Sequence, residues 1–239
     1  MPYYFYGFDW TYLVLVLPVL IISLVASARV NSTFRRYSEQ ISARRITGAQ
    51  AAQRVLSANG VSNVRIERIA GNLTDHYDPK ANVIRLSDQV YDNPSTAAIG
   101  VACHEAGHAI QYANNYGPIK LRAAIIPVTN IGSKLAMPLI LIGILITRLG
   151  EFSTVLIYLG IACFSLSLIF QLITLPVEFN ASRRAMQAIN ESNILTQEEQ
   201  IGAKKTLSAA AMTYVIATLA AFTQLLRLLI LFGGRRRND

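Results

Sequence analysis

Four long apolar segments constrain the fold of this chain more than any other feature, because about 20 apolar residues in a helix cross the hydrocarbon core of a bilayer. The segments cover residues 12–28, 138–146 with a start near 131, 155–175, and 207–232, the last weakened by Gln224 and Arg227. Composition agrees, since 52% of the 239 residues are hydrophobic and only 15% are charged. We therefore predict a mostly α-helical membrane protein with about three to four transmembrane segments.

The first segment is predicted to be a retained anchor. Aromatic residues gather at its start, as they do at a membrane interface: Tyr3, Tyr4, Tyr6, Trp10 and Tyr12. A secretory signal peptide would need a positively charged leading region and a cleavage site, and this segment has neither.

Lysine and arginine residues near the segments predict the orientation, because they concentrate on the cytoplasmic side. Basic residues follow the first and third segments: Arg29, Arg35, Arg36, Arg44, Arg45, Arg183, Arg184, Lys204 and Lys205. These flanks are predicted to be cytoplasmic, with the N-terminus and residues 148–154 outside. The arginines at 235–237 conflict with four full spans. Either the last segment is a re-entrant or interfacial hairpin broken near Gln224, or the charge rule fails at that end.

The net charge of +8 follows from these flanks, so we expect the lipid bilayer, and not nucleic acid, to be the partner of the basic residues. The two cysteines lie far apart in the sequence, which fits a reducing compartment without a disulfide. Cys103 is interpreted as a small packing residue.

Five regions are predicted along the chain: 1–29, an N-terminal transmembrane anchor; 30–120, a soluble α+β insert with a candidate metal-binding helix; 121–175, a transmembrane hairpin; 176–206, a helix with a candidate third metal ligand and a cytoplasmic segment; and 207–239, an apolar segment with a basic tail. Inside the insert we expect a helix over 47–59 capped by Thr47, a half-buried strand over 64–69, and a hairpin of 72–77 with 82–86. A further helix over 97–112 is expected to start at a cap supplied by Ser95 or Asn93.

The pentapeptide His-Glu-Ala-Gly-His, residues 104–108, lies in the middle of that last helix. Positions i and i+4 share one helix face, so His104 and His108 can bind one zinc ion while Glu105 takes a proton from the attacking water. Histidines at this spacing also occur by chance as satisfied core residues. Gly107 costs roughly 1 kcal/mol of helix stability against alanine, which suggests that another element packs closely there.

A catalytic zinc site needs a third protein ligand. Glu178 is the better candidate, because it follows Pro176 where the third apolar segment ends. The alternative interpretations are a solvated interfacial acid or a partner of Arg183 or Arg184. His76, the third histidine of the chain, is expected in a loop.

The chain resembles the YugP-like membrane zinc metallopeptidases of the glutamate-zincin class. The resemblance rests on separate blocks in the same order: residues 73–79 (LTDHYDP), 85–87 (RLS), 101–111 (VACHEAGHAIQ) and 175–185 (LPVEFNASRRA). It implies a zincin-like helix with His104 and His108 as zinc ligands, Glu105 as the catalytic carboxylate and Glu178 as the third ligand. Residues 178–182 are more distantly similar to the Glu-x-x-Ala-Asp segment of HtpX-type membrane proteases, with Ser182 in place of aspartate.

One residue departs from the family pattern. Asn180 stands where the family usually has aspartate, so it can form hydrogen bonds but cannot act as a charged partner of a histidine. His76, Tyr77 and Arg183 are candidates for stabilising the transition state.

The predicted function is a membrane-embedded zinc endopeptidase, with one Zn²⁺ per chain, that hydrolyses membrane or membrane-proximal proteins at the cytoplasmic face. Two alternatives come from other functional classes. One is a zinc-stabilised membrane scaffold without catalysis, and the other is an ion transporter whose histidines line the path. Against a transporter, the apolar run around His104 and His108 is too short to span a bilayer.

Overall fold

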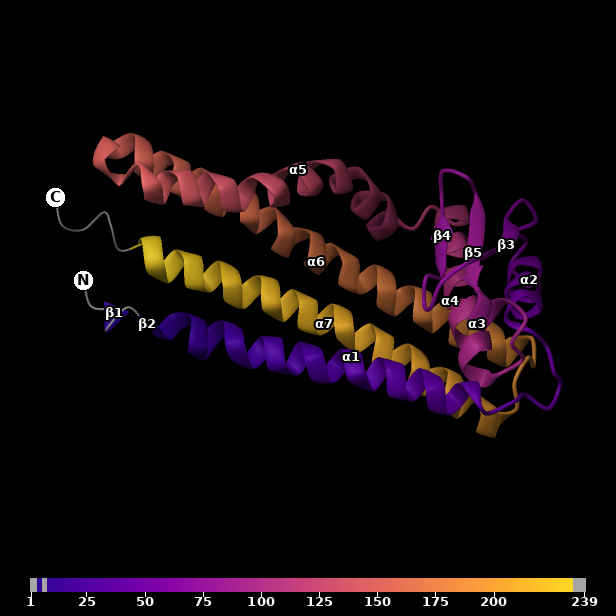
Figure 1. Ribbon diagram of the computed structural model, residues 1–239. Coiled ribbons are helices and arrows are strands. Elements are labelled where there is room, and N and C mark those ends of the chain that lie inside the picture. The colour runs from indigo at the N-terminus through magenta and orange to yellow at the C-terminus, as the bar shows by residue number, and fades with distance from the viewer. Residues whose placement is uncertain (1–3, 6–7, 234–239) are drawn as a thin grey trace. The chain divides into compact units, whose positions relative to one another are not determined.

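The computed structural model describes residues 4–5 and 8–233. Helices make up most of the chain (Figure 1): η1 Tyr12–Val16, α1 Leu17–Ser38, α2 Gly48–Ala58, α3 Asp88–Tyr91, α4 Thr96–Ala113, α5 Gly117–Leu145, η2 Thr147–Leu149, α6 Glu151–Glu191 and α7 Gln197–Gly233. The strands are β1 Tyr4–Phe5, β2 Phe8–Asp9, β3 Arg65–Ile69, β4 His76–Asp78 and β5 Val83–Ser87. The predicted fold class, mostly α with a small α+β insert, is confirmed.

The chain folds as two compact units. Unit 1 is built from the described parts of Met1–Val25, Leu121–Leu175 and Tyr214–Asp239, and unit 2 from Ala26–Lys120 and Pro176–Thr213. The three-stranded sheet and helices α2, α3 and α4 lie wholly in unit 2, whereas α1, α5, α6 and α7 contribute residues to both units.

Four helices are long and apolar enough to cross a membrane: Tyr12–Ser38, Gly117–Leu145, Glu151–Glu191 and Gln197–Gly233. Each coincides with one of the predicted apolar segments, although the second helix ends at Leu145, one residue before the predicted end. Helix α5 starts earlier than predicted because Pro127 and Pro138 are accommodated inside it. Helix α7 continues through Gln224, so the interpretation of the last segment as a broken hairpin is wrong.

In unit 1, α5 and α6 pack with their backbones close together. A Cβ atom at Gly160 would lie 2.8 Å from the carbonyl oxygen of Ala136, and one at Gly143 would lie 3.0 Å from that of Ser153. The Ser153 hydroxyl donates to the Gly143 carbonyl at 2.7 Å. Small residues let apolar helices approach in this way and gain dispersion contacts that lipid would otherwise supply.

The N-terminal end of the first apolar helix is tied to the last helix within unit 1. Asp9 accepts hydrogen bonds from the Thr11 hydroxyl at 2.5 Å and from Arg227 Nε at 3.0 Å, and it also forms an ion pair with Arg227 Nη2. The guanidinium carbon of Arg227 lies 5.5 Å from the centre of the Tyr12 ring. Tyr12 and Trp10 of the predicted aromatic belt are exposed, whereas Tyr3 and Tyr6 lie outside the described residues.

Unit 2 contains the sheet, in the order β3-β5-β4. Strand β5 pairs in parallel with β3 and antiparallel with β4, which confirms the predicted strand and the presence of a hairpin. The first strand of that hairpin begins at His76 and not at residue 72 as predicted. Helix α2 begins as predicted, because Thr47 and Gln50 form a reciprocal capping box. A single core joins α2, α4 and the sheet, and Leu56, Ile84, Leu86, Ile99 and Ile110 are fully buried in it.

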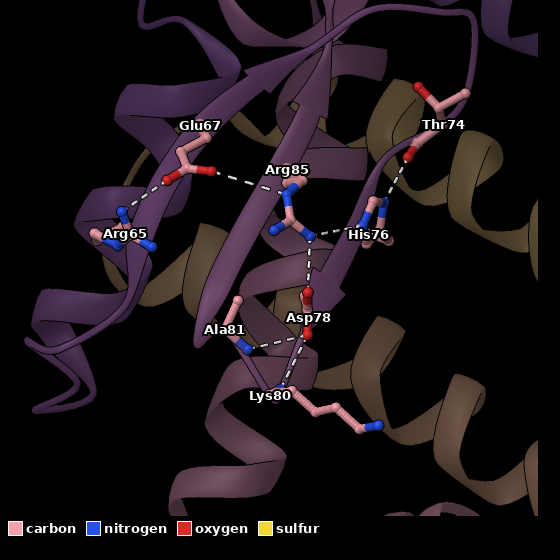
Figure 2. A network of polar contacts seen from close by, with 8 residues as sticks. All are labelled: Arg65, Glu67, Thr74, His76, Asp78, Lys80, Ala81 and Arg85. Carbon is pink, nitrogen blue, oxygen red and sulfur yellow. Dashed lines mark hydrogen bonds and ion pairs between the residues drawn. The ribbon is translucent and has the colours of Figure 1, made fainter. Parts of the chain in front are cut away.

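Charged residues occupy one face of the sheet (Figure 2). Arg85 on the central strand donates to Asp78 at 2.8 Å and lies 3.8 Å from Glu67 of β3. The hydrogen bond from Arg85 lowers the pKa of Asp78 to about 2. Side chains alternate between the faces of a strand, so this network leaves Tyr77 and Ile84 on the opposite face, where the core lies.

Candidate active site

Helix α4 carries the histidines because its start is well capped and its interior is apolar. The Ser95 side chain accepts a hydrogen bond from the Ala98 amide at 3.2 Å, so of the two predicted caps Ser95 is the one that acts. Residues 104–108 therefore fall in mid-helix, with His104 and His108 on one face.

Gly107 sets the distance between α4 and α6. A Cβ atom at this position would lie 2.6 Å from the carbonyl oxygen of Ala181, far closer than van der Waals contact allows. The predicted close packing at Gly107 is thus against the backbone of α6. At this crossing, Glu178 of α6 lies beside the two histidines of α4.

The two imidazoles converge on one carboxylate oxygen. Glu178 Oε2 lies 3.3 Å from His104 Nε2 and 3.5 Å from His108 Nε2. The ring centroids of the histidines are 4.7 Å apart and nearly perpendicular. The Glu178 side chain is only 3% exposed, which rules out the alternative of a solvated interfacial acid.

This donor set fits a zinc ion. One ligand atom from each of His104, His108 and Glu178 lies within 4.8 Å of the others. Two imidazole nitrogens and one carboxylate are the donors of a catalytic zinc site with one position left for water or substrate. The residues that the sequence predicted as ligands are therefore brought together, from helices separated by about seventy residues of chain.

Both histidines have a polar partner on their other ring nitrogen. His104 Nδ1 lies 3.1 Å from the Ser182 hydroxyl, and His108 Nδ1 lies 3.0 Å from Gln111 Oε1. Such contacts orient the rings so that Nε2 of each histidine faces Glu178, where a metal ion would be held.

The electrostatics of His108 favour a positive charge at the site. Burial lowers the pKa of His108, but its hydrogen bond to Glu178 and the negative charges of Glu105 and Glu178 outweigh this effect, so the pKa is raised. A proton and a metal ion compete for the same nitrogen lone pair, and both are favoured by these charges.

Glu105, the predicted catalytic residue, is 8% exposed and lies next to His104 on α4. No side chain among residues 4–5 and 8–233 forms a hydrogen bond with its carboxylate, which leaves both oxygens able to accept a proton from water. The negative charge of Glu105 also acts on Asp75. The pKa of Asp75 is raised, chiefly by burial and in addition by the charge of Glu105.

Asp75 joins two of the sequence blocks that carry the family resemblance. Its carboxylate accepts from the Ser87 amide at 2.7 Å and from the Ser87 hydroxyl at 3.0 Å. This clamp holds the start of β4 against the end of β5, and both strands contact α4. The blocks at 73–79 and 85–87 thus build the hairpin beside the zinc-binding helix.

None of the predicted transition-state residues forms a hydrogen bond or an ion pair with the three candidate ligands among the described residues. The prediction that His76 lies in a loop is wrong, because it is an exposed residue of β4, and its Nδ1 contacts the Thr74 carbonyl at 2.8 Å. The Tyr77 hydroxyl donates to Asn82 at 2.7 Å. Arg183 is exposed on α6 and has no polar partner among the described residues.

Asn180 has a place in the site through Gln111. Asn180 Oδ1 accepts from Gln111 Nε2 at 3.0 Å and from Arg184 Nε at 2.7 Å. Gln111 was not singled out from the sequence, although it lies three residues after His108 and hence on the same helix face. Its polarity within an otherwise apolar helix end was the available signal.

Comparison with known proteins agrees with this geometry. A family model described as "Putative neutral zinc metallopeptidase" matches residues 12–233. The protein named "Putative membrane protease YugP" of Bacillus subtilis (strain 168) is 45% identical over 228 residues, which is 95% of this chain and 99% of that relative. No solved structure gives a significant match. The predicted resemblance is confirmed, and the chain belongs to the neutral zinc metallopeptidase family that this model describes.

Proposed function

We propose that this protein is a membrane-embedded zinc endopeptidase that hydrolyses peptide bonds of membrane or membrane-proximal proteins. The observation that carries the proposal is the convergence of His104, His108 and Glu178, beside a glutamate whose carboxylate is free to accept a proton. The proposed stoichiometry is one Zn²⁺ per chain, because the described residues form one such group of three.

In the proposed mechanism, zinc held by His104, His108 and Glu178 would polarise the scissile carbonyl and lower the pKa of the attacking water. Glu105 accepts the proton from that water. It then delivers the proton to the amine that leaves, so one carboxylate acts first as base and then as acid. Placement next to His104 on α4 keeps Glu105 at the site in both steps.

Strand β4 is the proposed support for the substrate. It is an edge strand of the sheet, it contacts α4, and the hydrogen bonds between Asp75 and Ser87 fix its start. An extended peptide can add to such an edge through main-chain hydrogen bonds. The proposed substrate is therefore a segment that is extended, or unfolds locally, near the membrane surface.

The site is proposed to face the cytoplasm. The arginines after the first apolar segment support this orientation, and Arg29, Arg35 and Arg36 of α1 are exposed.

Purified full-length protein tests the proposed function through its zinc content and its cleavage of a casein-like substrate. We expect about one zinc per chain and measurable cleavage in the wild type. Glu105→Gln should keep the zinc and lower turnover about 10²- to 10⁴-fold, because it removes the base and leaves the ligands. A protein that binds zinc but does not cleave the substrate would favour the alternative of a zinc-stabilised scaffold. A protein that neither binds zinc nor cleaves the substrate would favour the alternative of an ion transporter.

A further inference from the structure

Gln111 lies on α4 three residues beyond His108, and its side chain is fully buried. An unmet hydrogen bond of a buried amide is costly, so every polar atom of this side chain needs a partner. Nε2 donates to the Val177 carbonyl at 2.8 Å and to Asn180 Oδ1 at 3.0 Å, both on α6. Oε1 lies 3.0 Å from His108 Nδ1.

The direction of each bond follows from what its atoms can do. The Val177 carbonyl only accepts, so the amide nitrogen of Gln111 must face it, and both amide hydrogens are then used on α6. Gln111 Oε1 only accepts as well. The hydrogen between Oε1 and His108 therefore resides on Nδ1, so in the neutral imidazole, the form that binds a metal, the lone pair is on Nε2, which faces Glu178.

Arg184 fixes the orientation of Asn180 in the same way. A guanidinium only donates, so the Asn180 atom that lies 2.7 Å from Arg184 Nε is the oxygen, and that oxygen also accepts from Gln111. An aspartate would offer the same oxygen. Asparagine is therefore sufficient here, which accounts for the departure from the family pattern at this position.

We infer that Gln111 is the positioning residue that holds His108 in the tautomer able to bind a cation and ties it to the helix that carries Glu178. The inference rests on the proposed function in naming zinc as that cation. His104 is held differently, because the Ser182 hydroxyl 3.1 Å from its Nδ1 can donate or accept and so selects no tautomer.

The test measures zinc affinity of the full-length protein in detergent by competition with a chelator, together with the visible absorption of the Co²⁺-loaded protein. Gln111→Met keeps the volume of the side chain and removes all three contacts. It should weaken zinc binding about 10- to 100-fold and change the cobalt spectrum. Asn180→Leu should also weaken binding, and Asn180→Asp should restore most of that loss because the accepting oxygen returns.

Thr96→Val is the matched control on the same helix. The buried Thr96 hydroxyl lies 3.3 Å from the Tyr37 carbonyl and 3.2 Å from Gln40, and it touches neither histidine. This variant should lower the thermal midpoint while keeping the wild-type zinc affinity and cobalt spectrum.

Wild-type affinity and an unchanged spectrum in Gln111→Met would overturn the inference and leave the proposed function standing. An equal loss in Thr96→Val would overturn it too, since the effect would then be general destabilisation. If Gln111→Met does not fold, the zinc affinities of the two Asn180 variants test the inference instead. Equal affinities of Asn180→Leu and Asn180→Asp would refute it. A wild type that binds no zinc would overturn both proposals.

Discussion

Gly107 and Ala181 bring the backbones of α4 and α6 into contact, since a Cβ atom on Gly107 would lie 2.6 Å from the Ala181 carbonyl oxygen. Glu178 lies three residues before Ala181 on α6, and His104 and His108 lie on either side of Gly107. The absent side chain at 107 therefore sets how closely the three candidate ligands approach one another.

Gly107→Ala is expected to destabilise the fold even though alanine favours a helix by about 1 kcal/mol over glycine. The added methyl group meets backbone atoms, and overpacking of this kind costs about 1–3 kcal/mol. The midpoint temperature of thermal unfolding and the affinity for zinc should both fall. Gly117→Ala is the control, because a Cβ atom there meets nothing within 4 Å and no loss is expected. Unchanged zinc affinity in Gly107→Ala would contradict the role given to this contact.

Glu178→Ala tests the third ligand. Two histidines alone should hold zinc far more weakly, so metal content and proteolysis should fall together. If Glu178 were only an ion-pair partner, zinc would stay bound and stability would change by roughly 0–1 kcal/mol.

Glu199→Ala is the matched control for Glu178→Ala. Glu199 is also a buried glutamate of unit 2, but it accepts hydrogen bonds from the Ala43 amide at 2.6 Å and from the Thr196 amide at 2.9 Å. Its loss should reduce stability without reducing zinc content. Full zinc occupancy in Glu178→Ala, measured on purified protein, would refute the ligand assignment.

The features that the sequence predicted well are encoded locally. Thr47 and Ser95 cap their helices through contacts that span three residues, so their patterns can be recognised without the fold. The i, i+4 spacing of His104 and His108 is local in the same sense. Glu178 was found because a carboxylate at the end of an apolar segment is unusual.

The features that the sequence did not predict depend on tertiary packing. The third apolar segment and the helix from residue 176 were predicted as separate elements, but α6 continues through Pro176 to Glu191. A proline inside a helix removes one hydrogen bond at a cost of about 3 kcal/mol, which packing of the following turns offsets. Ala181, Ala185 and Ile189 are fully buried in those turns. The partners of Gln111 likewise lie about seventy residues away on α6, beyond the reach of any local pattern.

Cysteine labelling tests the proposed topology. A cysteine at Ser62, exposed in the loop before β3, should resist an impermeant thiol reagent in intact cells and react after lysis. A cysteine at Leu149, in the turn between α5 and α6, should react from outside. The parent protein is the background control for Cys103 and Cys163. Labelling of Ser62→Cys in intact cells would invert the proposed orientation.

The same experiment examines the C-terminal end. Because α7 is unbroken to Gly233, four crossings would place position 238, which is outside the described residues, on the side of the N-terminus. Asn238→Cys should therefore react in intact cells, against the charge rule for the arginines at 235–237. Protection until lysis would show that α7 does not cross completely.

Because Asp9 and Arg227 form an ion pair, we expect the single variant Asp9→Ala to be less stable than the double variant in which Arg227 is also replaced. Asp9→Ala leaves the Arg227 charge in an apolar helix without its acid, which should cost about 1–3 kcal/mol. Adding Arg227→Leu removes that stranded charge, so the double variant should unfold at a higher temperature than Asp9→Ala alone. Glu151→Ala, an exposed acid at the start of α6, is the control and should change little. Thermal unfolding in detergent compares the wild type, the single variants Asp9→Ala and Arg227→Leu, the double variant and Glu151→Ala. A double variant whose loss equals the sum of the losses of the two single variants would show that Asp9 and Arg227 are not coupled.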